Sequence, residues 1–201
     1  MSINIILISG KQGSGKTTLG KALCSKINEI PKHRAVHMSF AEPLYKMHNF
    51  IWGYLEAYGY KRPGVKDGWL LQTLGTEFGR QRVSENVWVD ILQTSAHQEA
   101  DKYKEMKTVC VVSDCRFRNE FDKLKTESLT IRLACAKEVR LSRCEAWRDH
   151  DQHLSEIDLD DYSNAGLFDL NFNTEFCQVD NMVNTIIKHE KLKDFFEVPV
   201  K

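Results

Sequence analysis

The sequence has no excess of charge of either sign, because 28 lysines and arginines balance 28 aspartates and glutamates over 201 residues. A neutral chain has no overall field that attracts nucleic acid or an anionic membrane, so we expect no direct nucleic-acid partner. An anionic ligand must then bind at a local cluster of charge. The length suits one globular core, and we expect a single domain over residues 1–201.

Long apolar runs are also missing from the sequence. No segment approaches the roughly 18 consecutive apolar residues of a membrane span. No basic segment precedes the short apolar run near the N-terminus. We therefore expect a soluble protein of the cytoplasm with no membrane partner.

Paired cysteines are absent as well, since no C-x-x-C motif occurs among Cys24, Cys110, Cys115, Cys135, Cys144 and Cys177. Cys110 and Cys135 lie in apolar, strand-like runs, so we expect reduced thiols without a redox role. His150 and His153 follow Cys144 closely, but a zinc site needs a second matching pair of ligands. No zinc is expected.

The most informative segment is residues 10–17, GKQGSGKT, which satisfies the phosphate-loop pattern G-x-x-x-x-G-K-[ST] at every constrained position. The apolar run before it, residues 3–8, predicts a buried parallel strand. Leu19, Leu23 and Ile27 follow at intervals of four and predict one buried face of a helix. A glycine-rich turn that merely begins a helix is disfavoured, because the required strand and helix flank the loop in order.

Each position of this loop has a mechanical reason. Glycines let backbone N–H groups turn toward phosphate oxygens, and the helix N-terminus adds a favourable partial positive charge. Lys16 can reach the β- and γ-phosphates of ATP, and the hydroxyl of Thr17 can join the coordination shell of Mg²⁺. The residues expected to bind the ATP phosphates are Gly10, Gly13, Ser14, Gly15, Lys16, Thr17 and Thr18, and Lys16 is also expected to be catalytic.

Four further apolar runs, residues 35–40, 108–114, 129–134 and 168–172, alternate with helical patterns and predict an α/β sheet of five strands. Residues 41–104 form a helical excursion of about 60 residues, far longer than the dozen or so that a crossover needs. Three helices are predicted within it, over residues 41–59, from Asp67 to about Val83, and from Asn86 to about Tyr103. We expect this insertion to bind the second substrate.

The predicted strand over residues 108–114 ends in a carboxylate, which is typical of a Walker B strand. Ligands of open α/β sheets bind beyond the carboxyl ends of the strands, so Asp114 is expected beside the phosphate loop, where it can hold Mg²⁺. The alternative is that Asp114 caps the N-terminus of the following helix, and the two roles are compatible.

Arginines are concentrated in one part of the chain, since eight of the ten lie between residues 80 and 148. Guanidinium groups bind phosphate oxygens bidentately, so a site that holds two phosphorylated molecules would recruit several of them. The alternative is that most are solvated or paired with nearby acids. Arg140 and Arg143 lie on a helix predicted from Lys137 to about Asp149, and we interpret them as catalytic arginines of a mobile lid over about residues 137–150, by analogy with small kinases.

Four segments together carry a family resemblance: SFAEPL at 39–44, LQTLGTEFGR at 71–80, SDCRFRNE at 113–120 and HLSE at 153–156. The chain resembles the deoxynucleoside monophosphate kinases encoded by tailed bacteriophages. The resemblance implies a three-layer P-loop kinase fold, with a five-stranded parallel sheet flanked by helices, a helical substrate-binding insertion and a lid helix.

The resemblance also implies an activity. ATP and Mg²⁺ would be the cofactors, and the γ-phosphoryl group would pass to a deoxynucleoside 5′-monophosphate, giving a diphosphate for phage DNA synthesis in the host cytoplasm. Carried over position by position, Arg80 and Arg116 would bind the acceptor phosphate, Asp114 would serve the metal, and Arg140 and Arg143 would be the lid arginines.

Two other activities are weaker alternatives. Animal-type phosphomevalonate kinases share a phosphate loop and an S-D-x-R strand end, although the L-G-T-E-x-G-R segment favours a nucleotide acceptor. A switch GTPase needs an N-K-x-D segment, which is missing, and an ATPase motor places Glu after the Walker B Asp, where this chain has Cys115.

The aromatic residues Trp52, Trp69, Phe78 and Trp88 suit a hydrophobic core as well as a stacked base, and the core is favoured for each. Trp88 is the one that we name as a candidate for acceptor binding. Base preference and oligomeric state, including a homodimer, stay open.

Overall fold

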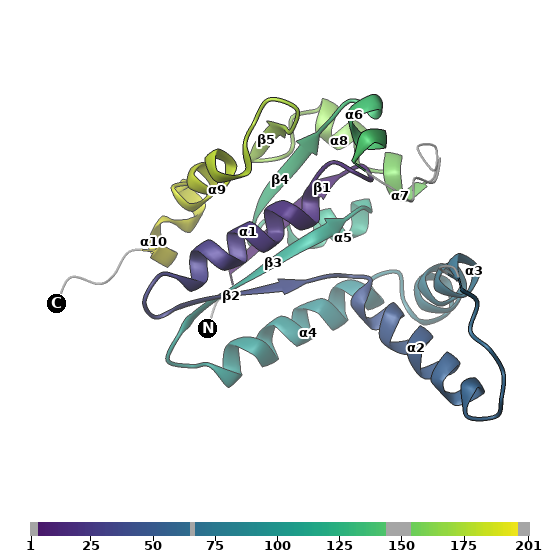
Figure 1. The fold of residues 1–201 in the computed structure, drawn as a ribbon. Coiled ribbons are helices and arrows are strands. Elements are labelled where there is room, and N and C mark those ends of the chain that lie inside the picture. The colour runs from purple at the N-terminus through teal and green to yellow at the C-terminus, as the bar shows by residue number, and fades with distance from the viewer. Residues whose placement is uncertain (1–3, 65–66, 144–153, 197–201) are drawn as a thin grey trace.

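The computed structural model describes residues 4–64, 67–143 and 154–196 (Figure 1). Its sheet has five strands in the order β2-β3-β1-β4-β5, and all four pairings are parallel. The strands are β1 (Asn4–Gly10), β2 (His33–Met38), β3 (Lys107–Cys115), β4 (Ser128–Ala134) and β5 (Leu170–Asn173). Because the strands are parallel, their carboxyl ends meet at one edge of the sheet.

Helices cover both faces of this sheet, because the buried strands carry apolar side chains on both faces. On one face, Ile6 and Ile8 pack with α1 (Lys16–Asn28) and α9 (Val179–Ile187). On the other face, Ile5 and Leu7 share a core with side chains of α4 (Val87–Lys102) and α5 (Arg118–Leu124). Figure 1 shows α1 and α9 in front of the sheet and α5 behind it. The result is three layers.

Short helices complete the described chain. They are α6 (Lys137–Ser142), α7 (Leu154–Ile157), α8 (Asp160–Asn164), a 3₁₀ turn at Glu190–Leu192 and α10 (Lys193–Phe196). In the described ranges no helix is long and apolar enough to cross a membrane, and no cluster of three metal-binding side chains occurs. The five cysteines that the structure describes are free thiols, in agreement with the sequence.

The predicted insertion contains α2 (Glu42–Glu56), α3 (Gly68–Gln72) and a π-helix, η1 (Thr73–Val83), before α4. Figure 1 shows α2 and α3 beyond the carboxyl end of β2. Helix α4 does not project, because it is part of the helical layer on one face of the sheet. Its residues in the core are Trp88, Val89, Leu92 and Ala96. The projecting part of the insertion is therefore residues 42–83 rather than the whole of 41–104.

The prediction of a helix from Asp67 to about Val83 is confirmed in extent, since α3 and η1 are contiguous from Gly68 to Val83, but the last eleven residues are wound as a π-helix. The cause lies in packing against α4. A Cβ atom on Gly79 would lie 2.2 Å from the ring of Trp88, and the indole Nε1 donates to the carbonyl oxygen of Gly75 at 2.8 Å. Gly79 thus makes room for the Trp88 ring, and Gly75 supplies the acceptor for its indole N–H. Turns of π-helix are common at functional sites.

The predicted lid helix is only partly described. Helix α6 ends at Ser142, and the rest of the prediction, to about Asp149, lies outside the described residues. His150 and His153, considered above for zinc, also lie outside them. Arg140 and Arg143 are described, and their surroundings are given below.

Candidate active site

The phosphate loop has the backbone that its glycines require. Gly10 has a φ of 151°, and a Cβ there would lie 2.7 Å from the carbonyl oxygen of Leu133. Gly15 precedes α1 in the left-handed conformation, with a φ of 91°, and no side chain caps the helix. The first N–H groups of a helix have no intrahelical acceptor, so this uncapped end suits the phosphates of ATP.

The hydroxyls around this end of α1 fit the same ligand. Thr17 and Thr18 are exposed in the first helical turn, where the predicted Mg²⁺ and phosphate contacts require them. The Oγ atom of Ser14 is buried and has no hydrogen-bond partner among the described residues. These placements agree with the predicted roles, which stay predictions until a ligand is bound.

Lys16 is buried, with only 8% of its surface exposed. Its charge is therefore shielded from solvent, unlike the charge of a typical loop lysine. Its Nζ donates to the carbonyl oxygens of Gly10 and Lys11 within the loop. Burial, together with the positive charge of Arg116, lowers the pKa of Lys16 to about 7. A second anion in the loop, such as a phosphate, would favour the charged ammonium again.

Asp114 does not cap the following helix. Its Oδ1 accepts from Phe40 N at 2.9 Å, and its Oδ2 accepts from Ser39 Oγ at 2.6 Å and Ala41 N at 3.1 Å. The N-cap residue of α5 is Phe117, and Glu120, in the first turn of the helix, reaches back with Oε2 to accept from Arg116 N and Phe117 N. The carboxylate of Asp114 therefore joins the end of β3 to the start of α2, and the metal role stays a prediction.

We expect Asp114→Asn to lower the melting temperature and to raise the Mg²⁺ concentration needed for turnover. Asparagine keeps one acceptor oxygen, so donors now bonded to Asp114 lose a charged partner, at about 1.5–3 kcal/mol per bond to a charged group. Thermal unfolding and a Mg²⁺ titration of turnover measure the two effects. Ser39→Ala is the control, since it removes one donor and leaves the carboxylate. If Asp114→Asn lost stability with unchanged metal dependence, Asp114 would be purely structural.

Arg116 follows β3 and lies between the phosphate loop and α7. Its guanidinium pairs with Glu156 Oε1, while Glu156 Oε2 accepts from the backbone N–H of Gln12 in the loop at 2.6 Å. Glu156 is only 6% exposed. One buried carboxylate therefore connects the loop that holds the donor phosphates to an arginine predicted to hold the acceptor.

Arg80 reaches the same region from the end of η1. Its guanidinium donates to Glu120 Oε1 at 2.8 Å and lies 4.0 Å from the centre of the Phe117 ring. Glu120 also accepts from the backbone N–H of Arg116, so one carboxylate connects the Arg80 guanidinium to the main chain at Arg116. The structure thus brings together two residues that are 36 positions apart in the sequence.

Acidic residues around the loop were missed by sequence reasoning. Asp160 pairs with Lys11 at 2.9 Å and with Arg132 at 2.5 Å, and Arg132 also donates to Ser9 Oγ at 2.9 Å. Many of the clustered arginines are therefore paired with acids, which was the alternative considered for them. The signal available in the sequence was the run of acids from Glu156 to Asp161, which matches the cluster of arginines in charge.

The two predicted lid arginines have different surroundings. Arg140 is buried, and it donates to Gln12 O in the phosphate loop at 3.0 Å and to Cys135 O at 3.2 Å. Arg143 is exposed and donates to the hydroxyl and the carbonyl oxygen of Thr174, after β5. Only Arg140 contacts the phosphate loop.

We expect Arg140→Ala to lower kcat by about 10²-fold and also to raise the KM for ATP, because it removes a buried charge that contacts the loop. Arg143→Ala should lower kcat and leave the KM for ATP unchanged. Steady-state kinetics with ATP varied at saturating acceptor separate the two. If Arg143→Ala kept the wild-type kcat, Arg143 would serve only to join α6 to the loop after β5.

The four candidate aromatic residues differ in their exposure to solvent. Trp88 is 4% exposed and packs in the core, so the choice of its ring for acceptor binding is corrected: it supports η1 instead. Trp52 is half-buried and donates to Asp67 Oδ2 at 3.1 Å. Trp69 and Phe78 are exposed on the insertion, where a base can stack on a ring.

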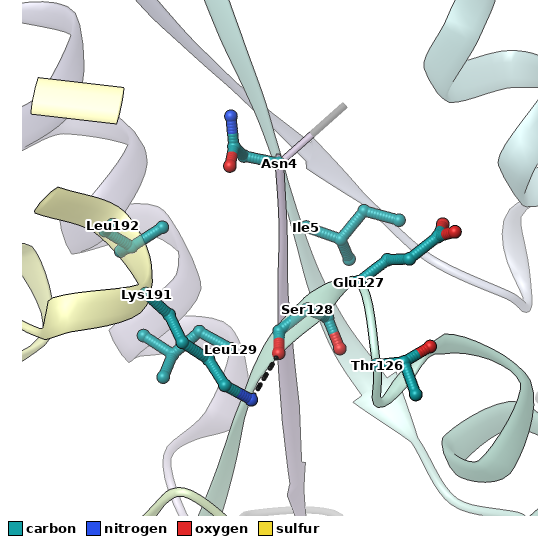
Figure 2. A pocket seen from close by; sticks show the side chains of 8 residues that line it. All are labelled: Asn4, Ile5, Thr126, Glu127, Ser128, Leu129, Lys191 and Leu192. Atoms are coloured by element: carbon teal, nitrogen blue, oxygen red, sulfur yellow. Dashed lines mark hydrogen bonds between the residues drawn. The ribbon is translucent and has the colours of Figure 1, made fainter. Parts of the chain in front are cut away.

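A small cavity of about 160 Å³ lies elsewhere, at the amino ends of β1 and β4 (Figure 2). Lys191 reaches across it and donates to Ser128 O at 3.1 Å. The seven residues of β1 separate it from the phosphate loop by about 20 Å at roughly 3.3 Å per residue. It is therefore distinct from the candidate active site.

Comparisons with known proteins give the family and the fold of this chain. A family model described as an AAA domain matches residues 6–162. No curated protein matches the sequence. The solved shikimate kinase from Acinetobacter baumannii in complex with shikimate is similar, with a TM-score of 0.50 and 15% identity over 92% of this chain and 91% of that one. Shikimate kinase from Bacteroides thetaiotaomicron gives a TM-score of 0.48 and 16% identity, over 92% and 97%.

At such identities the structural likeness shows the fold alone. The prediction of a P-loop kinase fold, a five-stranded parallel sheet flanked by helices, is confirmed. The family match begins in β1 and extends past Glu156, so it includes the phosphate loop, Asp114 and Arg116. A P-loop family of this kind implies ATP as a ligand, with Mg²⁺ as its usual partner. The chain belongs to the AAA domain family.

Proposed function

We propose that the chain transfers the γ-phosphoryl group of ATP to a deoxynucleoside 5′-monophosphate. The observation that carries the proposal is the Glu156 carboxylate, which accepts from Gln12 N in the phosphate loop and from the Arg116 guanidinium. An arginine held this close to the loop supports a second phosphate site next to the first. Phosphoryl transfer to an acceptor that is itself a phosphate ester requires such a pair of neighbouring phosphate sites.

The residues of the loop supply the donor half of the reaction. Lys16 would neutralise charge on the β- and γ-phosphates, and the N–H groups at the start of α1 would bind their oxygens. Thr17 and Asp114 would hold Mg²⁺, which would offset negative charge on the phosphates when bound. Arg140, which contacts the loop at Gln12 O, would stabilise charge on the transferring group.

The acceptor half rests on Arg80 and Arg116, whose planar forks match phosphate oxygens. A monophosphate ester is therefore favoured over an uncharged alcohol. The deoxynucleoside comes from the resemblance of the L-G-T-E-F-G-R and D-C-R-F-R-N-E segments to phage enzymes, as do the phage origin and a role in DNA precursor synthesis. Exposed Trp69 and Phe78 offer rings for the base.

A coupled assay of ADP release tests the proposal. The panel contains the deoxynucleoside and ribonucleoside monophosphates, mevalonate phosphate, and shikimate, which is the compound bound in a solved relative. We expect ADP release that depends on at least one deoxynucleoside monophosphate and that disappears in Lys16→Met.

Two other results of this assay would contradict the proposal and indicate a different activity. Turnover only with mevalonate phosphate or shikimate would assign a different acceptor to the same kinase fold. ATP consumption that is independent of any acceptor would indicate a nucleotide-driven switch or motor.

A further inference from the structure

The buried carboxylate of Glu120 lies at the junction of two segments that the proposed function needs. It comes from α5, is 1% exposed, and uses its two oxygens differently. Oε2 accepts from Arg116 N at 2.8 Å and Phe117 N at 3.1 Å, which fixes the turn after β3. Oε1 accepts from the Arg80 guanidinium at 2.8 Å.

The Arg80 guanidinium, which pairs with Glu120 Oε1, has further contacts that orient it. Arg80 stacks 4.0 Å above the Phe117 ring and donates weakly to Gly75 O at 3.4 Å. Its Nε is buried without a hydrogen-bond partner among the described residues, and its side chain remains 18% exposed. The exposed part of the Arg80 side chain can therefore contact a ligand, and the plane of the guanidinium is already oriented by the Phe117 ring and Glu120.

A buried ion pair is a weak source of stability, because desolvation of both charges offsets their attraction. Stability alone therefore does not explain why Glu120 and Arg80 are paired here. Glu120 joins η1, from the projecting insertion, to the turn that carries Arg116, so it sets the position of one arginine relative to the other. A bidentate phosphate contact tolerates little misplacement, since errors of about 1 Å can cost on the order of 10²-fold in rate.

We propose that Glu120 is a positioning residue that presents Arg80, together with Arg116, to the phosphate of the acceptor. The inference rests on the proposed function for the identity of that acceptor. It assigns Glu120 no contact with substrate, because the carboxylate acts through the arginine.

Glu120→Gln is a selective test. The amide oxygen can still accept from Arg116 N and Phe117 N, so the turn keeps its cap. The amide nitrogen then faces the Arg80 guanidinium as a second donor, and the ion pair is lost. We expect the KM for the acceptor to rise about tenfold or more, with little change in the KM for ATP.

A double-mutant cycle with Arg80→Lys separates positioning from general damage. If Glu120 acts through Arg80, the double variant should bind the acceptor no worse than Arg80→Lys alone. If the two effects on the acceptor KM simply multiply, the proposal is overturned. Asp122→Asn, which removes an exposed carboxylate of the same helix that pairs with Lys125, is the matched control and should show wild-type kinetics.

The pH profile gives a second readout that a purely structural role would not move. Burial raises the pKa of Glu120, the Asp114 carboxylate also raises it, and the N–H of Arg116 and the Arg80 guanidinium oppose the shift, which leaves the pKa at about 7. The pair with Arg80 is therefore complete above pH 7 and is lost as the pH falls below it. The difference in acceptor KM between wild type and Glu120→Gln should be large at pH 8 and small at pH 6.

Inorganic phosphate provides a probe that does not need turnover. It should raise the melting temperature of the wild type more than that of Glu120→Gln or Arg80→Lys, and the part of the shift that remains in both variants is binding at the phosphate loop, which all three proteins keep. If phosphate acts in this way but no monophosphate of the panel is phosphorylated, the proposed function fails and the inference holds. If an acceptor is phosphorylated and Glu120→Gln keeps its wild-type KM and phosphate response, only the inference fails. No effect of phosphate on the wild type would also count against the inference.

Discussion

Lys16→Met is expected to abolish ATP-dependent phosphoryl transfer and to raise the melting temperature of the ligand-free protein. Without the ammonium, the β- and γ-phosphates lose the buried cation of the loop, since Lys11 is paired with Asp160, so we expect a loss of about 10³-fold or more. The gain in stability has a different cause. Lys16 is buried among backbone carbonyls and close to Arg116, so its charge is costly in the empty loop.

The pH dependence of that gain follows from the pKa of Lys16, which is about 7 in the folded protein and 10.5 in its unperturbed state. Between these values the unfolded chain binds more protons at Lys16 than the folded chain, so the stability of the wild type rises with pH. Below pH 7 the folded protein carries the full cost of the buried ammonium. Methionine has no such cost, so the difference in melting temperature should be large at pH 6 and small at pH 10.

Thermal unfolding at several pH values, together with the ADP-release assay, tests both parts. Lys21→Met is the control, since Lys21 is an exposed lysine of the same helix and should change neither quantity. Near-normal turnover by folded Lys16→Met would contradict the kinase assignment. An unchanged melting temperature at pH 6 would contradict the burial of its charge.

Arg116→Lys is expected to raise the KM for the acceptor by about 10- to 100-fold, while the KM for ATP changes little. Lysine keeps the charge but cannot offer a planar fork, and a hydrogen bond to a charged group contributes about 1.5–3 kcal/mol. Lysine is also shorter than arginine, so its ion pair with Glu156 is weaker. That ion pair connects position 116 to the phosphate loop. Initial rates with acceptor and ATP varied separately measure the two constants.

The neighbouring arginine supplies the control for this experiment. Arg118 is more exposed and pairs with Asp158 and Asp161 on the protein surface. Arg118→Lys should therefore leave the acceptor KM within about twofold of wild type, because exposed ion pairs contribute little. Equal effects of the two substitutions would show that Arg116 has no special access to the acceptor.

The sequence alone determined the features that depend on neighbouring residues. The apolar strand, the glycine-rich loop and the helix that carries Leu19, Leu23 and Ile27 are contiguous, so backbone preference and periodicity were enough to predict β1, the phosphate loop and α1. The alternation of strands and helices predicted the α/β class for the same reason. The L-G-T-E-F-G-R and D-C-R-F-R-N-E segments marked the two arginines that the structure brings together.

Only the tertiary structure decided which side chains meet, because those contacts join residues far apart in the chain. Glu156 reaches the N–H of Gln12 across 144 positions, and Asp114 reaches the start of α2 across more than 70. The burial of Lys16 and the π-helical winding around Trp88 likewise depend on packing partners that no local pattern specifies. Local periodicity says which face of an element is apolar, whereas the pairing of a buried charge depends on the order of strands in the sheet, here β2-β3-β1-β4-β5.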